Sequence, residues 1–169
     1  MSSQLVPDAH EDEIGTTREH EVGAITRRDV RRYARAVEDE NPLFHDVDAA
    51  REHGYDDLVV PPNFLPAIIE RSTGSPADDL REDGLDPNLY PIELPPDAIL
   101  MGGGQDLTID AYATAGAEIT VHETLTDIYQ RDSDSMGQLT FIELHSEYFT
   151  DGDTRVMSCD ETVIVGDRQ

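Results

Sequence analysis

The stretch of residues 58–70 reads LVVPPNFLPAIIE and is almost free of charge. Its large apolar side chains recur at the spacing of one helical face: they are Phe64, Leu65, Ile68 and Ile69. Pro62 fits the first turn of such a helix, because the N–H that proline lacks has no helical partner there. A helix this apolar has to be buried. We therefore predict a central helix near residues 62–73, with the rest of the chain packed around it.

From Gln105 onward, apolar and polar residues alternate with a period of two, which is typical of strands with one buried face. Turn-forming residues at 132–137 and 151–153 separate these runs and indicate antiparallel hairpins. The proline-rich residues 72–98 are predicted to be a long loop, and such loops in compact domains are usually functional. The predicted fold class is α+β, with a long antiparallel sheet wrapped around the central apolar helix.

Two further helices are predicted before the apolar stretch. Thr26 followed three residues later by Asp29 is typical of a helix N-terminus. The apolar face of this helix consists of Val30, Tyr33, Ala34 and Val37. Pro42 ends it, because the residue before a proline avoids the helical region. A second, short helix is expected at residues 47–53, where Gly54 follows its last turn.

The composition bounds the class of protein. The chain has 169 residues, 37 of them acidic and 12 basic, with a net charge of −25. Residues 1–20 are polar and acidic and are predicted to form a flexible tail, followed by a single domain over residues 21–169. The negative charge argues against nucleic acid and anionic membrane surfaces as partners. No apolar run approaches the ~20 residues of a membrane span, and no secretory signal is visible. We therefore expect a cytoplasmic protein.

The numbers of cysteine, histidine and lysine residues bear on disulfides, metal binding and adaptation to salt. A single cysteine, Cys159, cannot form an internal disulfide, and the six histidines lack metal-ligand spacing, so no metal site is predicted. All 12 basic residues are arginine. Molar salt shortens the Debye length to ~3 Å and relieves the repulsion among so many acids, so the composition fits an extreme halophile. The alternative is a partly disordered acidic protein.

The segment that carries candidate chemistry is Tyr33–Ala50, YARAVEDENPLFHDVDAA. By spacing alone, it is a helix end, an Asn-Pro turn and a second helix with an Asp cap. However, Asp39-Glu40-Asn41-Pro42-Leu43-Phe44-His45-Asp46 resembles the signature, roughly D-x-N-P-[LI]-H-x-D, of the MaoC-type hydratase/dehydratase family, the hot-dog-fold (R)-specific enoyl-thioester hydratases. The run AAREHGYDDLVVPPNF at residues 49–64 and Gly103-Gly104-Gln105-Asp106 resemble further motifs of that family.

The resemblance covers about residues 20–165 and is strongest to the N-terminal MaoC-like subtype, also called the FAS1-like dehydratase domain. That subtype includes accessory subunits of heterodimeric dehydratases. The resemblance implies an acyl-CoA or acyl-carrier thioester as substrate, no cofactor, and a homo- or heterodimer with a MaoC-like chain that covers the sheet edges. The catalytic candidates it implies are Asp39, Asn41 and His45. The substrate-binding candidates are Tyr33, Phe44, Pro62, Asn63, Phe64, Gly103 and Gly104.

This chain departs from the family pattern at the catalytic histidine. Phe44 occupies the histidine position, His45 lies one residue later, and Gly102 replaces a second family histidine. Three interpretations follow: a non-catalytic partner in a heterodimer, a site rebuilt around His45, or thioester binding without chemistry. A one-residue shift on an extended segment moves a side chain to the opposite face, which weakens the second. The resemblance also implies an oxyanion donor from the backbone N–H of Asn63 or Phe64.

Two rival functions remain. A hot-dog thioesterase needs a carboxylate or an amide on the central helix, and Asn63 and Glu70 are the available residues. The Asn-Pro step argues against this reaction. The non-enzymatic rival is an acyl-CoA binding or interaction protein.

Overall fold

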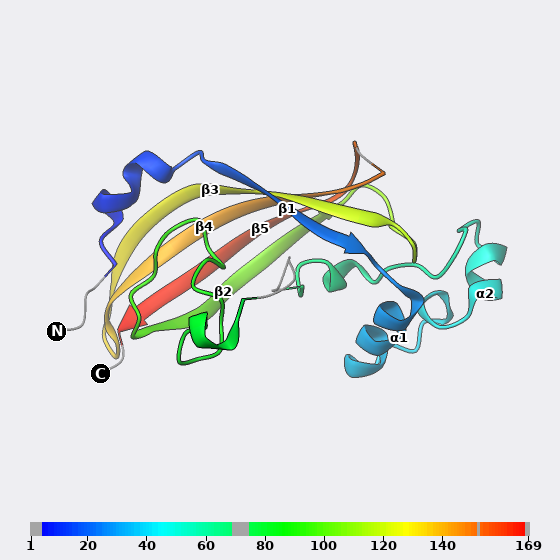
Figure 1. The fold of residues 1–169 in the computed structure, drawn as a ribbon, viewed down its shortest axis with the longest axis horizontal. Helices are drawn as coiled ribbons and strands as arrows, with labels where there is room; N and C mark the ends of the chain where they lie inside the picture. Colours follow the sequence, from blue (N-terminus) through cyan, green and yellow to red (C-terminus); the bar gives the residue numbers. More distant parts are fainter. Residues whose placement is uncertain (1–4, 69–74, 152, 168–169) are drawn as a thin grey trace.

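The computed structural model describes residues 5–68, 75–151 and 153–167. One antiparallel sheet of five strands dominates it, in the order β1-β3-β4-β5-β2. Its strands are β1 (Thr17–Ala24), β2 (Ala98–Ile109), β3 (Glu118–Ser133), β4 (Gly137–Thr150) and β5 (Thr154–Asp167). The helices α1 (Arg27–Ala36) and α2 (Val47–Glu52) gather at one end of the long, curved sheet (Figure 1). The predicted α+β class and antiparallel sheet are confirmed.

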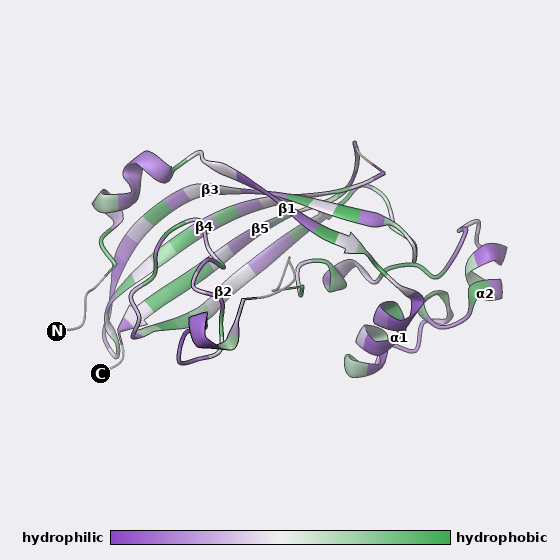
Figure 2. Ribbon diagram, in the orientation of Figure 1, coloured by the Kyte–Doolittle hydropathy of each residue, from purple (hydrophilic) through white to green (hydrophobic). Residues whose placement is uncertain are grey.

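Strands β3, β4 and β5 form a meander whose pairings are set by tight connections. Ser133 pairs with Gly137 across the first connection and Thr150 with Thr154 across the second, as the turn signals predict. Along β4, every second residue from Thr140 to Thr150 is buried. Figure 2 shows the resulting alternation of hydrophobic and hydrophilic bands along the strands. The other face carries partly exposed polar side chains, including His122 and His145.

The buried side chains form two apolar clusters on the same face of the sheet. The helix-side cluster contains Val30, Ala34, Phe44, Leu58, Leu65 and Tyr148, among others. The loop-side cluster contains Leu5, Ile92, Leu94, Leu125, Ile142 and Val165, among others. Where the two clusters meet, the strand register aligns a row of polar or small residues, Arg18, Glu123, Ser146 and Cys159, the last of which belongs to the helix-side cluster. The buried Cys159 packs as a small core residue.

The predicted long loop is confirmed over residues 75–97, which contain only a 3₁₀ turn at Ala77–Asp79. The loop folds back over one half of the sheet (Figure 1) and buries Ile92 and Leu94 in the loop-side cluster. Two arginines hold it. Arg18 of β1 donates to the carbonyls of Asn88, Leu89 and Tyr90, and Arg81 donates to those of Pro95 and Ala98. These bonds satisfy backbone carbonyls that apolar packing would otherwise leave without partners.

The prediction of a central helix at residues 62–73 is wrong for residues 62–68, the part that the structure describes. Pro62–Phe64 form a 3₁₀ turn and residues 65–67 continue as turns, while 69–74 lie outside the described residues. Three prolines in six residues explain this, because Pro61, Pro62 and Pro66 remove donors from any regular helix. The segment still delivers an apolar side chain, Leu65, to the helix-side cluster.

The N-terminal segment also differs from the expected flexible tail. Leu5 is buried, Pro7–Glu13 form a 3₁₀ helix, and β1 begins at Thr17. Polar composition did not prevent order here, because the first strand pairs with β3 along its whole length. Strand β2 likewise begins at Ala98, before the predicted start at Gln105, because its first residues pair with the end of β5.

Candidate functional site

The site is built on the C-terminal end of α1. This helix begins with a reciprocal capping box between Thr26 and Asp29, as the sequence indicates. It ends at Ala36, before Pro42, and Val37 is exposed instead of lying on the predicted apolar face. The N–H of Asp39 donates to Ala34 and that of Glu38 to Arg35, which is a Schellman arrangement. Glu38 therefore adopts a φ of 57°, where glycine is the usual residue.

The Asp39–Asn41–Pro42 segment is a turn held by its own side chains. The carboxylate of Asp39 accepts the N–H of Asn41 at 2.9 Å, and the amide oxygen of Asn41 accepts the N–H of Leu43 at 3.1 Å. Asn41 in this way caps the 3₁₀ turn Pro42–Phe44. Both side chains are exposed and have structural partners, so the local role that spacing alone suggests is real.

Phe44 and His45 point in different directions from this turn. Phe44 is only 6% exposed and packs in the helix-side cluster. His45 remains partly exposed, and its Nε2 lies 2.7 Å from the backbone carbonyl oxygen of Asp39. A carbonyl only accepts, so Nε2 carries a proton and Nδ1 is the basic nitrogen of a neutral ring. The imidazole therefore binds the backbone of Asp39, and the carboxylate of Asp39 binds a different group.

Asp39 and His45 nevertheless share one hollow, which we call the acidic hollow. It is lined by Ala34, Arg35, Glu38, Asp39, Glu40 and His45. Three carboxylates make this hollow unfavourable for an anion, and Arg35 is its only fixed positive charge among the lining residues. The structure thus brings two of the catalytic candidates together, but the imidazole of His45 bonds the backbone of Asp39 and not its carboxylate.

A second hollow, the apolar hollow, lies on the other side of α1. It is lined by Val22, Ala24, Ile25, Asp29, Arg32, Tyr33, Phe64 and Ile68 and offers about 370 Å³ of space. The rings of Tyr33 and Phe64 lie 5.0 Å apart between centroids. Partial burial raises the pKa of Tyr33, so its phenol stays neutral at any physiological pH. Two of the predicted substrate-binding residues therefore form one aromatic wall.

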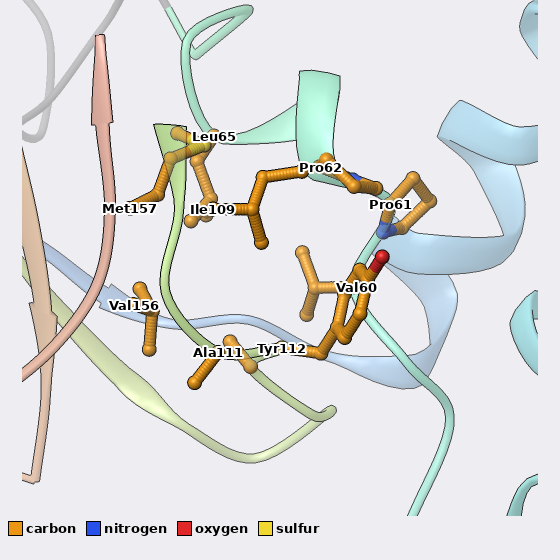
Figure 3. Close-up of a pocket in the computed structure, with 10 residues that line it drawn as sticks. Val60, Pro61, Pro62, Leu65, Ile109, Ala111, Tyr112, Val156 and Met157 are labelled. Atoms are coloured by element: carbon orange, nitrogen blue, oxygen red, sulfur yellow. The ribbon is translucent and has the colours of Figure 1, made fainter. Parts of the chain in front are cut away.

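The other substrate-binding candidates are distributed over several places. Pro62 lines a small cavity, in which Val60, Pro61, Pro62 and Leu65 face Ile109, Tyr112, Val156 and Met157 (Figure 3). Asn63 is exposed. The N–H of Phe64 donates to the carbonyl of Pro61 at 2.9 Å, so of the two predicted oxyanion donors Asn63 is the one left to consider. Glu70, the thioesterase candidate, lies outside the described residues.

Gly103 and Gly104 lie on the exposed edge strand β2 and line neither the acidic nor the apolar hollow. A Cβ at Gly103 would approach Thr162 to 2.7 Å, and the strand register shifts between Gly102 and Gly104. This is a bulge that only glycine fits, so the close approach of the backbone to Thr162 is enough to explain the glycine at position 103.

Two kinds of residue near the site were not singled out from the sequence. Arg31 donates to the carbonyl of His45 at 3.1 and 3.2 Å and fixes the end of the turn. Arg28, Arg32 and Arg35 lie exposed along α1. The sequence signal that could have identified these residues is the concentration of five arginines within residues 27–36. Within the described part of the chain, no group of three histidine, cysteine or acidic side chains is placed to hold a metal ion, and no helix is long and apolar enough to cross a bilayer.

The comparisons with known proteins identify the family of this chain. The family model described as "FAS1-like, dehydratase domain region" matches residues 12–159. A UPF0336 protein of Thermobifida fusca is 31% identical over 144 residues, which cover 85% of this chain and 84% of that protein. A UPF0336 protein of Parafrankia sp. is 38% identical over 104 residues. That alignment covers 62% of each chain, so it spans less than two thirds of the relative's length.

Solved structures show the same fold. The ChsH1–ChsH2 complex of Mycobacterium tuberculosis matches with a TM-score of 0.69 at 17% identity, over 91% of this chain and 86% of that one. (R)-Hydratase PhaJ1 of Pseudomonas aeruginosa matches with 0.65 at 16% identity, over 99% and 90%. The HadBC (3R-hydroxyacyl-ACP dehydratase) complex of M. tuberculosis matches with 0.61 at 18% identity, over 90% and 97%. The expected hot-dog fold of the MaoC-like dehydratases is confirmed.

Proposed function

This chain belongs to the family of FAS1-like dehydratase domains, and from that premise we propose that it is the accessory subunit of an (R)-specific enoyl-thioester hydratase. The same assembly would catalyse the reverse dehydration of a 3-hydroxyacyl thioester. In this proposal a related chain carries the Asp/His pair, and the present chain shapes the channel for the acyl-CoA or acyl-carrier substrate. The acidic composition supports the further proposal that this assembly works in the salt-rich cytoplasm of a halophile.

The observation that carries the proposal is the environment of Phe44. Hydration adds the oxygen of water to the β carbon and a proton to the α carbon of the thioester, so a base and an acid must hold one water. A phenyl ring buried in the core can do neither. His45 could replace it only if the imidazole left the carbonyl of Asp39 and met that residue's carboxylate. A general acid–base group typically contributes ~10²–10⁴-fold, so a chain without one should be slow by about that factor.

Two observations support a partner chain. The edge strand β2 exposes residues 102–106 and leaves a row of backbone groups that a second sheet can pair with. In addition, two structures of this fold, ChsH1–ChsH2 and HadBC, are complexes of two chains. The acidic and apolar hollows, at the end of the sheet where the helices gather, would border the channel between the subunits.

The test is hydration of crotonyl-CoA in molar KCl, followed by the loss of the enoyl absorbance. We expect little activity from this chain alone and an increase of at least about 10²-fold with a co-encoded MaoC-like chain that has an intact Asp-x-Asn-Pro-x-His. His45→Ala in this chain should leave the activity of the assembly unchanged. Replacing the partner's catalytic aspartate by asparagine should abolish it.

Other outcomes decide between the alternatives. Activity of this chain alone, lost in His45→Ala, would contradict the accessory role and assign catalysis to Asp39 and His45. Tight binding of acyl-CoA with no turnover in either format would favour a thioester-binding protein, which the burial of Phe44 also fits. Release of free CoA would indicate a thioesterase.

A further inference from the structure

The charge of this protein is unevenly distributed. Helix α1, with the sequence RRDVRRYARA, holds five arginines and one acid in ten residues. The whole chain has only 12 basic residues and a net charge of −25. A segment of net charge +4 in such a chain creates a local positive field beside the candidate site.

Two of these arginines have structural roles. Arg27 makes a bidentate ion pair with Asp57, and Arg31 binds the carbonyl of His45. Arg28, Arg32 and Arg35 are exposed, and none of them makes an ion pair or a side-chain hydrogen bond with the residues that the structure describes. Their spacing of four and then three residues places them on one face of the helix. We call these three residues the arginine stripe.

The arginine stripe adjoins the apolar hollow. Arg32 is part of its lining, next to the aromatic wall of Tyr33 and Phe64. The only acid in that lining is Asp29, whose carboxylate accepts both the N–H and the hydroxyl of Thr26. The hydrogen bonds with Thr26, together with the nearby charges of Arg28 and Arg32, lower the pKa of Asp29, and the bonds with Thr26 hold its carboxylate at the helix cap. A positive rim therefore borders an apolar space.

The acidic residues that follow α1 make one end of the arginine stripe unfavourable for an anion and leave the other end favourable. Glu38, Asp39 and Glu40 line the acidic hollow together with Arg35 and oppose an anion there. Arg28 and Arg32 lie nearer the helix N-terminus, where the peptide dipoles also favour negative charge. Two guanidinium groups four residues apart can reach one phosphate group together, and each can bind it through two N–H donors.

We propose that Arg28 and Arg32 bind the phosphate of a phosphopantetheine arm, whose apolar dimethyl group then lies in the apolar hollow against Tyr33 and Phe64. This deepens the proposed function by assigning the entrance for its thioester substrate, and it rests on that function for the identity of the arm. Coenzyme A and a carrier protein both contain this phosphopantetheine, so the stripe recognises the chemistry that they share.

The experiment compares three probes in binding titrations: pantetheine, 4′-phosphopantetheine and coenzyme A. The protein is studied in its assembly if a partner is found, at several KCl concentrations. We expect phosphopantetheine to bind at least about tenfold more tightly than pantetheine, as expected for charge-assisted hydrogen bonds, with the difference shrinking as salt rises. The double variant Arg28→Gln/Arg32→Gln should remove this preference.

The matched control is Arg51→Gln. Arg51 is an exposed arginine on α2 whose only side-chain hydrogen bond to the described residues goes to the carbonyl of Asp56, so the variant loses the same type of residue outside the stripe. It should keep the phosphate preference. Glutamine has a helix propensity close to that of arginine, so circular dichroism should show all variants folded.

The outcomes separate this inference from the proposed function. Loss of the phosphate preference in the double variant would support phosphate binding by the arginine stripe, whether or not the protein has hydratase activity. Absence of hydratase activity would count against the proposed function and not against the stripe. In an active assembly, the double variant should raise KM for crotonyl-CoA and leave kcat unchanged. An unchanged KM, or a phosphate preference that survives in the double variant, would overturn the inference. Equal affinity for phosphopantetheine and CoA would support the phosphate that they share as the bound group. Tight binding of CoA alone would overturn the inference and identify the nucleotide phosphates of CoA as the ligand.

Discussion

The two halves of the sheet face are covered in different ways. Over the helix-side cluster, short segments between residues 25 and 68 pack through apolar side chains such as Val30, Phe44 and Leu65. Over the loop-side cluster, an irregular loop contributes Ile92 and Leu94 and is tied down by Arg18 and Arg81. One half thus depends on local capping and packing, and the other on long side chains that reach backbone carbonyls.

The difference shows how an irregular segment can cover a core. A helix satisfies its own backbone, so α1 needs only its caps. The loop has no such ladder, and Arg18 supplies donors to three consecutive carbonyls while its charge is balanced by Glu123 at 2.7 Å. Glu123 is 2% exposed, so the loop-covered half depends on a buried ion pair.

The largest expected effect is the loss of the fold in low salt. Residues 75–97 carry seven acids and one arginine, so this loop should repel the acidic surface most strongly once screening is removed. Dialysis out of molar KCl should first expose amides of the loop-covered half in hydrogen exchange and then unfold the chain in circular dichroism. An unchanged spectrum in dilute buffer would contradict this prediction.

Next in size, Arg18→Ala should lower the free energy of unfolding by about 3–5 kcal/mol, because it removes the arginine that pairs with the buried Glu123 and releases the loop. Denaturant titration measures the loss. Arg155→Ala is the control, since Arg155 pairs with Asp110 and Glu147 on the surface and should matter far less. The double variant Arg18→Met/Glu123→Leu should recover much of the stability. If the single variant behaves like Arg155→Ala, the loop does not depend on this pair.

A smaller effect is expected on the helix-covered half. Thr26→Ala removes the side chain that accepts the N–H of Asp29 and should cost about 1 kcal/mol of unfolding free energy. Exchange protection should fall at the start of α1 and stay unchanged in the loop at residues 75–97. Equal loss in both places would show that the two halves unfold as one unit.

The smallest effect should be a gain. Glu38 has a φ of 57°, so Glu38→Gly removes strain at the end of α1 and should stabilise the chain by about 0.5–1 kcal/mol. Thermal unfolding at a fixed salt concentration measures this. Glu40→Gly removes the same charge from the same hollow without a positive φ to relieve, so it should give no gain. A similar gain in both variants would assign the effect to charge.

The candidate site was only partly predictable. The signature located the segment Asp39–Asp46, and the one-residue offset predicted that His45 and Phe44 point in different directions, as they do in the structure. That His45 binds the carbonyl of Asp39 and that Phe64 uses its N–H within its own turn depends on backbone geometry that no residue pattern specifies. Whether these residues act in catalysis remains a prediction.

The sequence by itself determined the elements whose signals are local: the capped helix α1, the short helix before Gly54, and the alternating strands β3 and β4. The tertiary structure alone decided β1 and the covering of the sheet. The inward side of β1 carries Arg18, which looks like a surface residue until it meets Glu123, 105 positions later. Caps and alternation act between near neighbours and can be read along the chain. The burial of a charge depends on a partner that only folding brings close.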